Sequence, residues 1–152
     1  MIKDSGERRT FSTGAVRDHH QGKGRCDLMP LAVIANLIEN RTGGDYILGE
    51  IARFSKNRKT IHLYRALIGF SIVAFDDSVE TMLLEVSKHF EEGARKYGEN
   101  NWQKGLPVNC YLDSAIRHYL KYRRGDKDEP HGRAFVWNLL CCIWEVDHRV
   151  KN

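Results

Sequence analysis

Apolar residues recur at every third or fourth position between residues 79 and 97, and this spacing constrains the fold more than any other feature. Because an α-helix has about 3.6 residues per turn, side chains spaced in this way lie on one face. Asp77 or Ser78 can begin the helix, and Gly98 can end it. The pattern therefore predicts a long amphipathic helix. Its apolar face comprises Val79, Met82, Leu83, Val86, Phe90, Ala94 and Tyr97.

Helical character extends over most of the remaining chain. Asp27 can cap a helix that has Pro30 in its first turn. Residues 60–75 are too apolar for periodicity to separate helix from strand, but the length of the run favours a buried helix. No alternating pattern of convincing length indicates a strand, so we expect an all-α fold, a compact bundle of about five or six helices. The further predicted helices are 27–40, 46–54, 60–75, 110–124 and 131–149.

The first residues differ from this helical part. Residues 1–26 are polar, basic and rich in glycine, which predicts an arm without regular structure. The length of 152 residues suits one domain with its own core, and we assign that domain to residues 27–152.

Composition excludes several classes of protein. An apolar fraction of 41% with 29% charged residues is typical of a globular protein, and no apolar run approaches the roughly 20 residues that cross a membrane. No secretory signal begins the chain, and the four cysteines have no zinc-like spacing, so we expect a cytoplasmic protein with buried thiols. The net charge of +4 is too small for duplex DNA but suits a small polyphosphate.

The segment GAVRDHHQGKGRCDLMP, residues 14–30, concentrates positive charge on flexible backbone. Its cations Arg17, Lys23 and Arg25 can act with backbone amides as a clamp for phosphate groups. The alternative is a solvated tail.

A second candidate cluster occupies HFEEGARKYGENNWQKG, residues 89–105. Glu92 and Lys96 lie four residues apart on one polar stripe, where they can pair or face a ligand. Trp102 follows two amides, and an indole beside hydrogen-bonding groups offers a surface on which a base can stack. The alternative for Trp102 is a core anchor that holds the loop.

The third cluster lies in YLDSAIRHYLKYRRGDKDEPH, residues 111–131. Arg117 and His118 can bind phosphate from a helix, because a guanidinium fork matches two phosphate oxygens. Arg117 can equally pair with Asp113, and His118 can be a core histidine. Asn138, in an otherwise apolar helix, needs a buried partner or a ligand.

Acidic residues and one histidine precede the last predicted helix. Oxygen ligands with a histidine can hold Mg²⁺ or Mn²⁺, and the same acids can instead complement the helix dipole. The group is Asp126, Asp128, Glu129 and His131.

Three motifs in order, FSTGAVRD…GKGRCDLMP, HFEEGARKYGENNWQKGLP and YLDSAIRHYLKYRRGDKDEPHGRAFVWN, resemble the dATP/dGTP diphosphohydrolase N-terminal domain family of phage and prophage genomes. The similarity covers roughly residues 11–30 and 79–148. It implies a phage origin, in the host cytoplasm, and a purine nucleotide as the ligand. The motif positions it carries over as nucleotide-binding are Arg17, Lys23, Arg25, Glu92, Lys96, Tyr97, Asn101, Trp102, Arg117 and His118.

The catalytic activity in that family's name is less well supported by the residues. All-α pyrophosphatases of the MazG type hold Mg²⁺ with an ExxE pair and a later ExxD, and neither spacing occurs here. Cleavage of a phosphoanhydride needs metal and converging carboxylates to neutralise developing charge. The motif positions are instead mainly basic, amide and aromatic.

We therefore expect a non-catalytic binder, without a cofactor, that sequesters a purine nucleotide or a nucleotide-derived signal of host anti-phage immunity. The alternative is a Mg²⁺- or Mn²⁺-dependent diphosphohydrolase, in which Glu92, Asp128 and Glu129 hold the metal. A third hypothesis is an interaction protein whose arm binds a partner. We also expect a homo-oligomer, whose arm completes a pocket on a neighbouring subunit.

Overall fold

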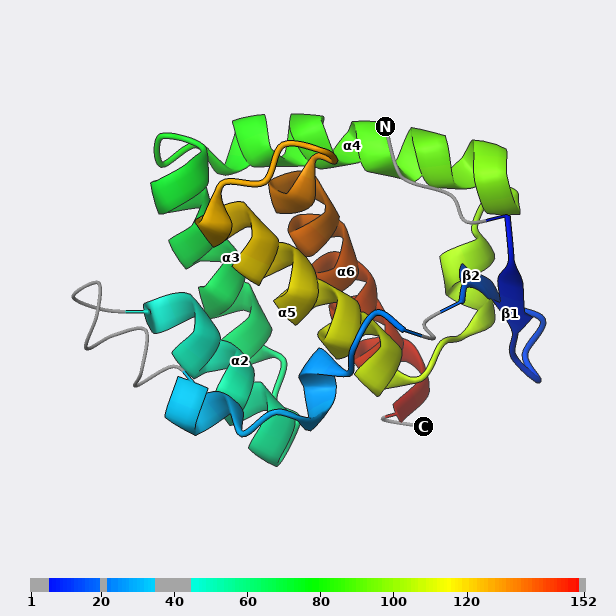
Figure 1. Cartoon of the computed structure of the whole chain (residues 1–152), viewed down its shortest axis with the longest axis horizontal. Helices are drawn as coiled ribbons and strands as arrows, with labels where there is room; N and C mark the ends of the chain where they lie inside the picture. The colour runs from blue at the N-terminus through cyan, green and yellow to red at the C-terminus, as the bar shows by residue number, and fades with distance from the viewer. Residues whose placement is uncertain (1–5, 20–21, 35–44, 151–152) are drawn as a thin grey trace.

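The computed structural model describes residues 6–19, 22–34 and 45–150, and these residues form a helical bundle with one small β-hairpin (Figure 1). The all-α expectation is confirmed. The elements are β1 (Arg8–Thr10), β2 (Val16–Asp18), the 3₁₀ turn η1 (Cys26–Leu28), α2 (Tyr46–Asn57), α3 (Ile61–Ala74), α4 (Val79–Tyr97), the 3₁₀ turn η2 (Asn101–Lys104), α5 (Val108–Arg124), α6 (His131–Glu145) and the π-helical turn η3 (Val146–Val150).

The ends of the long helices follow local sequence rules. Ser78 begins α4, where its side chain accepts a hydrogen bond from the Thr81 amide, as the sequence predicted. The Gly98 amide donates to the Ala94 carbonyl where α4 ends. Gly125 ends α5 in the left-handed conformation, with φ +88°, that glycine adopts without strain.

The core lies where α5 and α6 pack along each other and against α3. Phe70 of α3 is fully buried, and its ring meets the ring of Phe135 edge-on at 4.8 Å and that of Tyr122 at 5.0 Å between centroids. Burial of one such phenylalanine contributes about 1.5–3 kcal/mol. In Figure 1, α4 runs across the top of this bundle, and its right-hand end lies near the hairpin.

The arm is more ordered than the sequence predicted. β1 and β2 pair antiparallel, with Arg9 opposite Arg17, and Gly14 supplies a left-handed turn residue at φ +86°. Ala15 is fully buried, so the hairpin packs on its own chain. Strands of three residues are too short to show an alternating pattern, and this is why the prediction of an irregular arm was wrong.

Two predicted helices also differ in detail. Asp27 does not cap a helix, because its carboxylate pairs with Arg25 inside the η1 region; residues 31–34 are helical, and the rest of the predicted helix, residues 35–40, lies outside the described residues. α3 is buried on one face only, and the side chains of Ile68, Ile72 and Val73 are about half exposed or more. The last helix changes to π-helical geometry after Glu145.

No helix among the described residues is long and apolar enough to cross a lipid bilayer. All four cysteines are free. Cys141 and Cys142 are buried, as expected, and burial raises the pKa of Cys142 to about 12. Cys26 and Cys110 are only partly buried.

Candidate functional site

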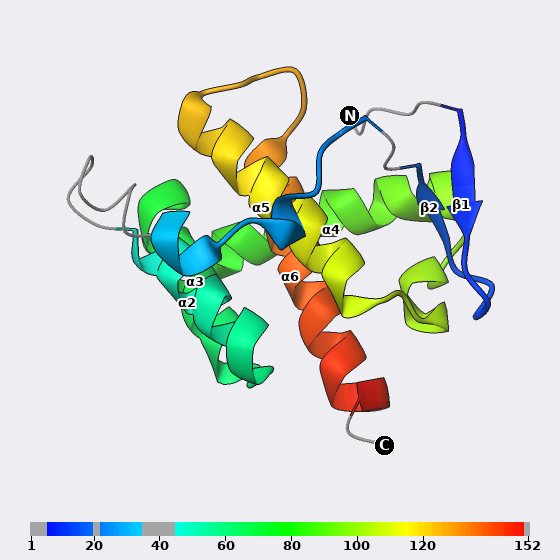
Figure 2. The ribbon, with the colours of Figure 1, turned by 60° about the horizontal axis from the view of Figure 1, so that its bottom comes forward.

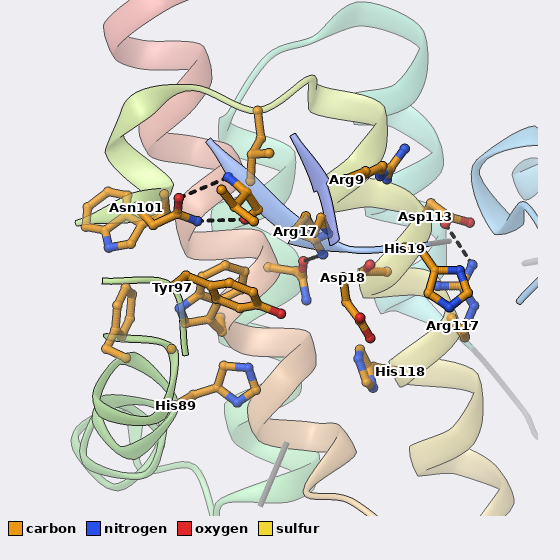
Figure 3. Close-up of a pocket in the computed structure, with 18 of the residues that line it drawn as sticks. Arg9, Arg17, Asp18, His19, His89, Tyr97, Asn101, Asp113, Arg117 and His118 are labelled. Carbon is orange, nitrogen blue, oxygen red and sulfur yellow. Dashed lines mark hydrogen bonds and ion pairs between the residues drawn. The ribbon is translucent and has the colours of Figure 1, made fainter. Parts of the chain in front are cut away.

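A cavity of about 680 Å³ lies between the hairpin, α4, η2, α5 and α6 (Figure 3). Its volume falls within the range of small-molecule sites, which is about 300–1,000 Å³. Figure 2 shows the hairpin beside the far end of α4, so segments separated by more than 80 residues meet here. The cavity joins the regions of all three motif clusters.

Two arginines of the hairpin form the most distinctive part of the lining. Arg9 and Arg17 lie directly opposite each other across β1 and β2, an arrangement that places both side chains on the same face of the hairpin. Like charges in such a pair repel, which destabilises the sheet unless an anion lies between them. Arg9 donates to the Cys110 sulfur at 3.3 Å, and its buried Nε has no hydrogen-bond partner among the residues that the structure describes.

Arg17 reaches further into the molecule. Its guanidinium donates to Asn138 Oδ1 at 2.7 Å and lies 5.6 Å from the ring centroid of Tyr111 and 5.9 Å from that of Trp137. Asn138 is itself oriented by its Nδ2, which donates to the Ala134 carbonyl. Arg17 is thus the partner that the buried Asn138 required.

The environment of Arg17 is unfavourable for an isolated cation. Burial lowers the pKa of the Arg17 guanidinium below its ordinary value. Within the described part of the chain, no carboxylate forms an ion pair with either Arg9 or Arg17. A buried charge without a counter-ion costs several kcal/mol, so this end of the cavity is suited to an anion.

Aromatic side chains line the cavity next to Arg17. Trp102 packs edge-on against Phe90 at 5.7 Å and against Trp144 at 5.1 Å, and Trp137 lies 5.5 Å from the ring of His89. In the described part of the chain, the buried His89 Nδ1 and Trp137 Nε1 have no hydrogen-bond partner. Burial, followed by the nearby Arg133, lowers the pKa of His89 to about 4, so its imidazole is neutral near pH 7. A buried polar atom without a partner is a cost that the packing of these rings carries.

The arm cations predicted from the sequence separate in the structure. Lys23 lines the cavity and pairs with Asp18 at 3.2 Å. Arg25 lies outside the lining and forms a two-bonded pair with Asp27, at 2.7 and 2.6 Å, which raises the pKa of Arg25. The structure therefore places Arg17 and Lys23 at the cavity and Arg25 on the exposed surface.

The α4 residues separate in the same way. Glu92 pairs with Arg133 at 2.9 Å, and Lys96 lies over the Tyr97 ring at 5.3 Å; neither lines the cavity. Tyr97 does line it, and the Arg8 guanidinium lies 5.0 Å from its ring centroid.

Asn101 and Trp102 line the cavity, but both also hold the surrounding structure together. The Asn101 side chain accepts from the Val16 amide at 3.0 Å and donates to the Val16 carbonyl at 2.8 Å, which pins β2 to η2. Because both ends of the amide are used, it has little capacity left for a base. The ring contacts of Trp102 agree with the core-anchor alternative.

Arg117 lines the cavity and orders the arm. It pairs with Asp113 at 2.7 Å and donates to the carbonyls of Lys23 and Gly24 at 3.1 and 2.7 Å. The carboxylate of Asp113 also accepts the Cys26 amide. The alternative of an Asp113–Arg117 pair is therefore present, and the same guanidinium positions Lys23.

His118 lines the cavity beside the acidic loop. Its Nδ1 lies 2.9 Å from Nδ1 of His131, whose Nε2 lies 2.7 Å from Asp128. Asp126 pairs instead with Arg124. Among the described residues, two groups have metal-ligand spacing, one of His118, Glu129 and His131 and one of Asp126, Asp128 and His131. Glu92 belongs to neither group, so it does not join Asp128 and Glu129 as predicted.

Sequence reasoning missed Arg9, His89 and Trp137. Arg9 faces the cavity only because of the hairpin register, and a three-residue strand carries no pattern that reveals this. His89 and Trp137 are the sequence neighbours of Phe90 and Asn138 on predicted helices, and the direction of their side chains depends on how α4 and α6 pack.

Comparison with known proteins agrees with the resemblance seen in the motifs. No curated protein and no solved structure matches the chain significantly. The family described as dATP/dGTP diphosphohydrolase, N-terminal, matches residues 67–152, from α3 to the C-terminal residue given. The match covers more than half of the 152 residues, and the hairpin lies outside it. The chain therefore belongs to the dATP/dGTP diphosphohydrolase N-terminal domain family.

Proposed function

We propose that the protein binds a purine nucleotide in this cavity and holds it without turnover. The observation that carries the proposal is the cross-strand pair of Arg9 and Arg17, two guanidiniums at the cavity with no carboxylate partner among the described residues. Phosphate oxygens match a guanidinium fork in geometry and charge. A bound phosphate would offset the free-energy cost of the buried Arg17 charge. It would also reduce the repulsion between the two cations.

The aromatic wall suits the base. A purine ring stacks on tryptophan or tyrosine faces with about 1–3 kcal/mol per base, and such rings line the side of the cavity made by α4, η2 and α6. Neutral His89 lies beside these rings at the cavity and can donate a hydrogen bond to the base or accept one from it. The description of the family, which names dATP and dGTP, supports a purine over a pyrimidine.

Two of the carboxylates that line the cavity, Asp18 and Asp113, favour binding over hydrolysis. Asp18 pairs with Arg8 and Lys23, and Asp113 pairs with Arg117. These acids are neutralised by cations of the chain, whereas phosphoanhydride cleavage needs carboxylates that converge on a metal. We propose that the biological role is sequestration, with a nucleotide signal of host anti-phage immunity as the bound molecule.

The second candidate function is a metal-dependent diphosphohydrolase. The family description favours it, and Glu129 and His118 at the cavity are its candidate ligands. Glu92, the acid first proposed for that role, is engaged with Arg133.

One incubation distinguishes the two functions. Pure protein in excess is mixed with dATP, dGTP, and linear and cyclic purine oligonucleotides, with Mg²⁺ or Mn²⁺, and is then removed by filtration or denatured by heat. We expect one nucleotide to be depleted from the filtrate and to return intact after heating. Its return as monophosphate and pyrophosphate would establish the hydrolase. Full recovery of every nucleotide in the filtrate would contradict both functions.

Self-association is a separate proposal. The hairpin lies over the cavity of its own chain, so a neighbouring subunit is not needed to cover it. Sedimentation equilibrium of the pure protein measures whether the expected homo-oligomer forms.

A further inference from the structure

At the cavity that Arg9 and Arg17 line, three potential metal ligands converge from different parts of the chain. His118 projects from α5, Glu129 lies in the loop before α6, and His131 is the first residue of α6. One ligand atom from each lies within 4.8 Å of the other two. His118 and Glu129 also line the cavity.

The two imidazoles have the separation of neighbouring ligands on one ion. Their Nδ1 atoms are 2.9 Å apart. Two nitrogens that each lie about 2.0–2.1 Å from a metal subtend about 90° at this separation. This angle corresponds to adjacent positions of an octahedron, whereas a tetrahedral ion requires nitrogens farther apart.

Asp128 orients one of these ligands. A carboxylate only accepts hydrogen bonds, so the 2.7 Å contact places a proton on Nε2 of His131 and leaves the lone pair on Nδ1. His131 is fully buried at its side chain, which fixes the ring. A carboxylate that holds the outer nitrogen of a histidine is the usual support of a metal-binding imidazole.

His118 can present the same nitrogen to an ion as His131 does. Its Nδ1 is the atom that faces Nδ1 of His131 at 2.9 Å. A neutral imidazole can place its lone pair on Nδ1 by moving its proton to Nε2, without a change of charge.

We propose that His118, Glu129 and His131 bind a divalent first-row transition-metal ion whose remaining coordination positions face the cavity. Two imidazoles and one carboxylate on one face of an octahedron suit such ions, whereas Mg²⁺ and Ca²⁺ prefer sites made of oxygen. The metal site is a separate proposal from nucleotide binding, because its three ligands already converge in the protein without a nucleotide. If the proposed function also holds, the open positions accept phosphate oxygens, and the metal raises nucleotide affinity.

The first test uses the full, tag-free protein and Co²⁺ alone, without nucleotide. We expect one Co²⁺ per chain by calorimetry, with the weak visible absorption of a six-coordinate ion. His118→Gln and Glu129→Gln should each lower Co²⁺ affinity by about 100-fold or more, because each removes a direct ligand. Asp128→Asn should lower it by about 10–100-fold, as expected for a residue that positions a ligand.

His148→Gln is the matched control, because His148 is an exposed histidine outside the cluster. It should bind Co²⁺ as the unmodified protein does. Circular dichroism of each variant tests whether the helices are retained. If His118→Gln does not fold, the Co²⁺ affinity of Glu129→Gln tests the proposal. Absence of Co²⁺ binding by the unmodified protein, or equal affinity in folded ligand variants and control, would overturn the proposal. Because nucleotide is absent, that failure leaves the nucleotide-binding proposal intact.

Discussion

At the scale of a single residue, the surroundings of Arg17 are the main support for the proposed anionic ligand. Its guanidinium is held by one amide oxygen and two aromatic rings, and these groups orient a cation without neutralising it. A carboxylate in the place of Asn138 would have formed a stable internal pair. Under the proposed function, the charge is instead available to a phosphate group of the ligand.

We therefore predict that Arg9→Gln and Arg17→Gln each weaken nucleotide binding by about 10–100-fold, since a hydrogen bond to a charged group contributes about 1.5–3 kcal/mol. Calorimetry or filter binding measures the loss. Arg95→Gln is the charge-matched control, because Arg95 is 70% exposed and pairs with Glu91 on α4. Affinity that falls equally in the control would assign the effect to overall charge.

His89 makes stability depend on pH. Its pKa falls from an ordinary 6.5 to about 4 on folding, so between these values the unfolded chain binds more protons and stability rises with pH. The stabilisation present above pH 6.5 is lost as the pH falls toward 4. At pH 5 the loss from this residue is about 2 kcal/mol.

Urea unfolding at pH 7.5 and pH 5 measures this loss directly, and His118 contributes with the same sign. A His89→Gln variant should show a smaller difference between the two pH values. An identical difference in the variant and the unmodified protein would show that His89 does not titrate as stated.

At the scale of elements, the hairpin is held to the bundle by a few polar contacts. Asn101 forms both hydrogen bonds of a backbone-like pair with Val16, and Thr13 donates to the Gly105 carbonyl at 2.6 Å. The hairpin carries Arg9 and Arg17, so its attachment decides where the two cations lie.

Asn101→Ala should free the hairpin and leave the helices in place. Loss of two hydrogen bonds with Val16 costs about 1–3 kcal/mol, and hydrogen exchange at the Val16 amide should become faster. Nucleotide affinity should fall with it, because the hairpin carries Arg9 and Arg17. Gln103→Ala, at an exposed position in the same turn, is the control. Unchanged exchange at Val16 would contradict this role.

At the scale of the whole molecule, the cavity joins elements from both ends of the described chain. A ligand that contacts the hairpin, α4, α5 and α6 binds only the folded state, so it stabilises all of them together. At a concentration 100 times its Kd, the gain is about 2.7 kcal/mol.

We expect saturating purine nucleotide to raise Tm by about 5–10 °C, measured by circular dichroism or calorimetry. A pyrimidine nucleotide with the same phosphates should raise it less, and Arg17→Gln should abolish most of the shift. Equal shifts for purine and pyrimidine would contradict recognition of the base by the aromatic wall.

The sequence by itself determined the helices and the family. Helix formation depends on interactions within a few residues, so it can be predicted without the tertiary structure. Examples are the apolar spacing of residues 79–97, the Ser78 cap and the helix end at Gly125. The three motifs identified the family, and the basic arm pointed to an anion before its structure was known.

Only the tertiary structure decided which motif residues share a site. Arg17 and Arg25 look alike in sequence, yet one is buried against Asn138 and the other pairs with Asp27 on the surface. The register of the hairpin places Arg9 opposite Arg17, and the packing of α5 on α6 brings His118 into contact with His131. These outcomes depend on contacts between residues far apart in the chain. Local propensity carries no information on such contacts, because their geometry is set by how the elements pack.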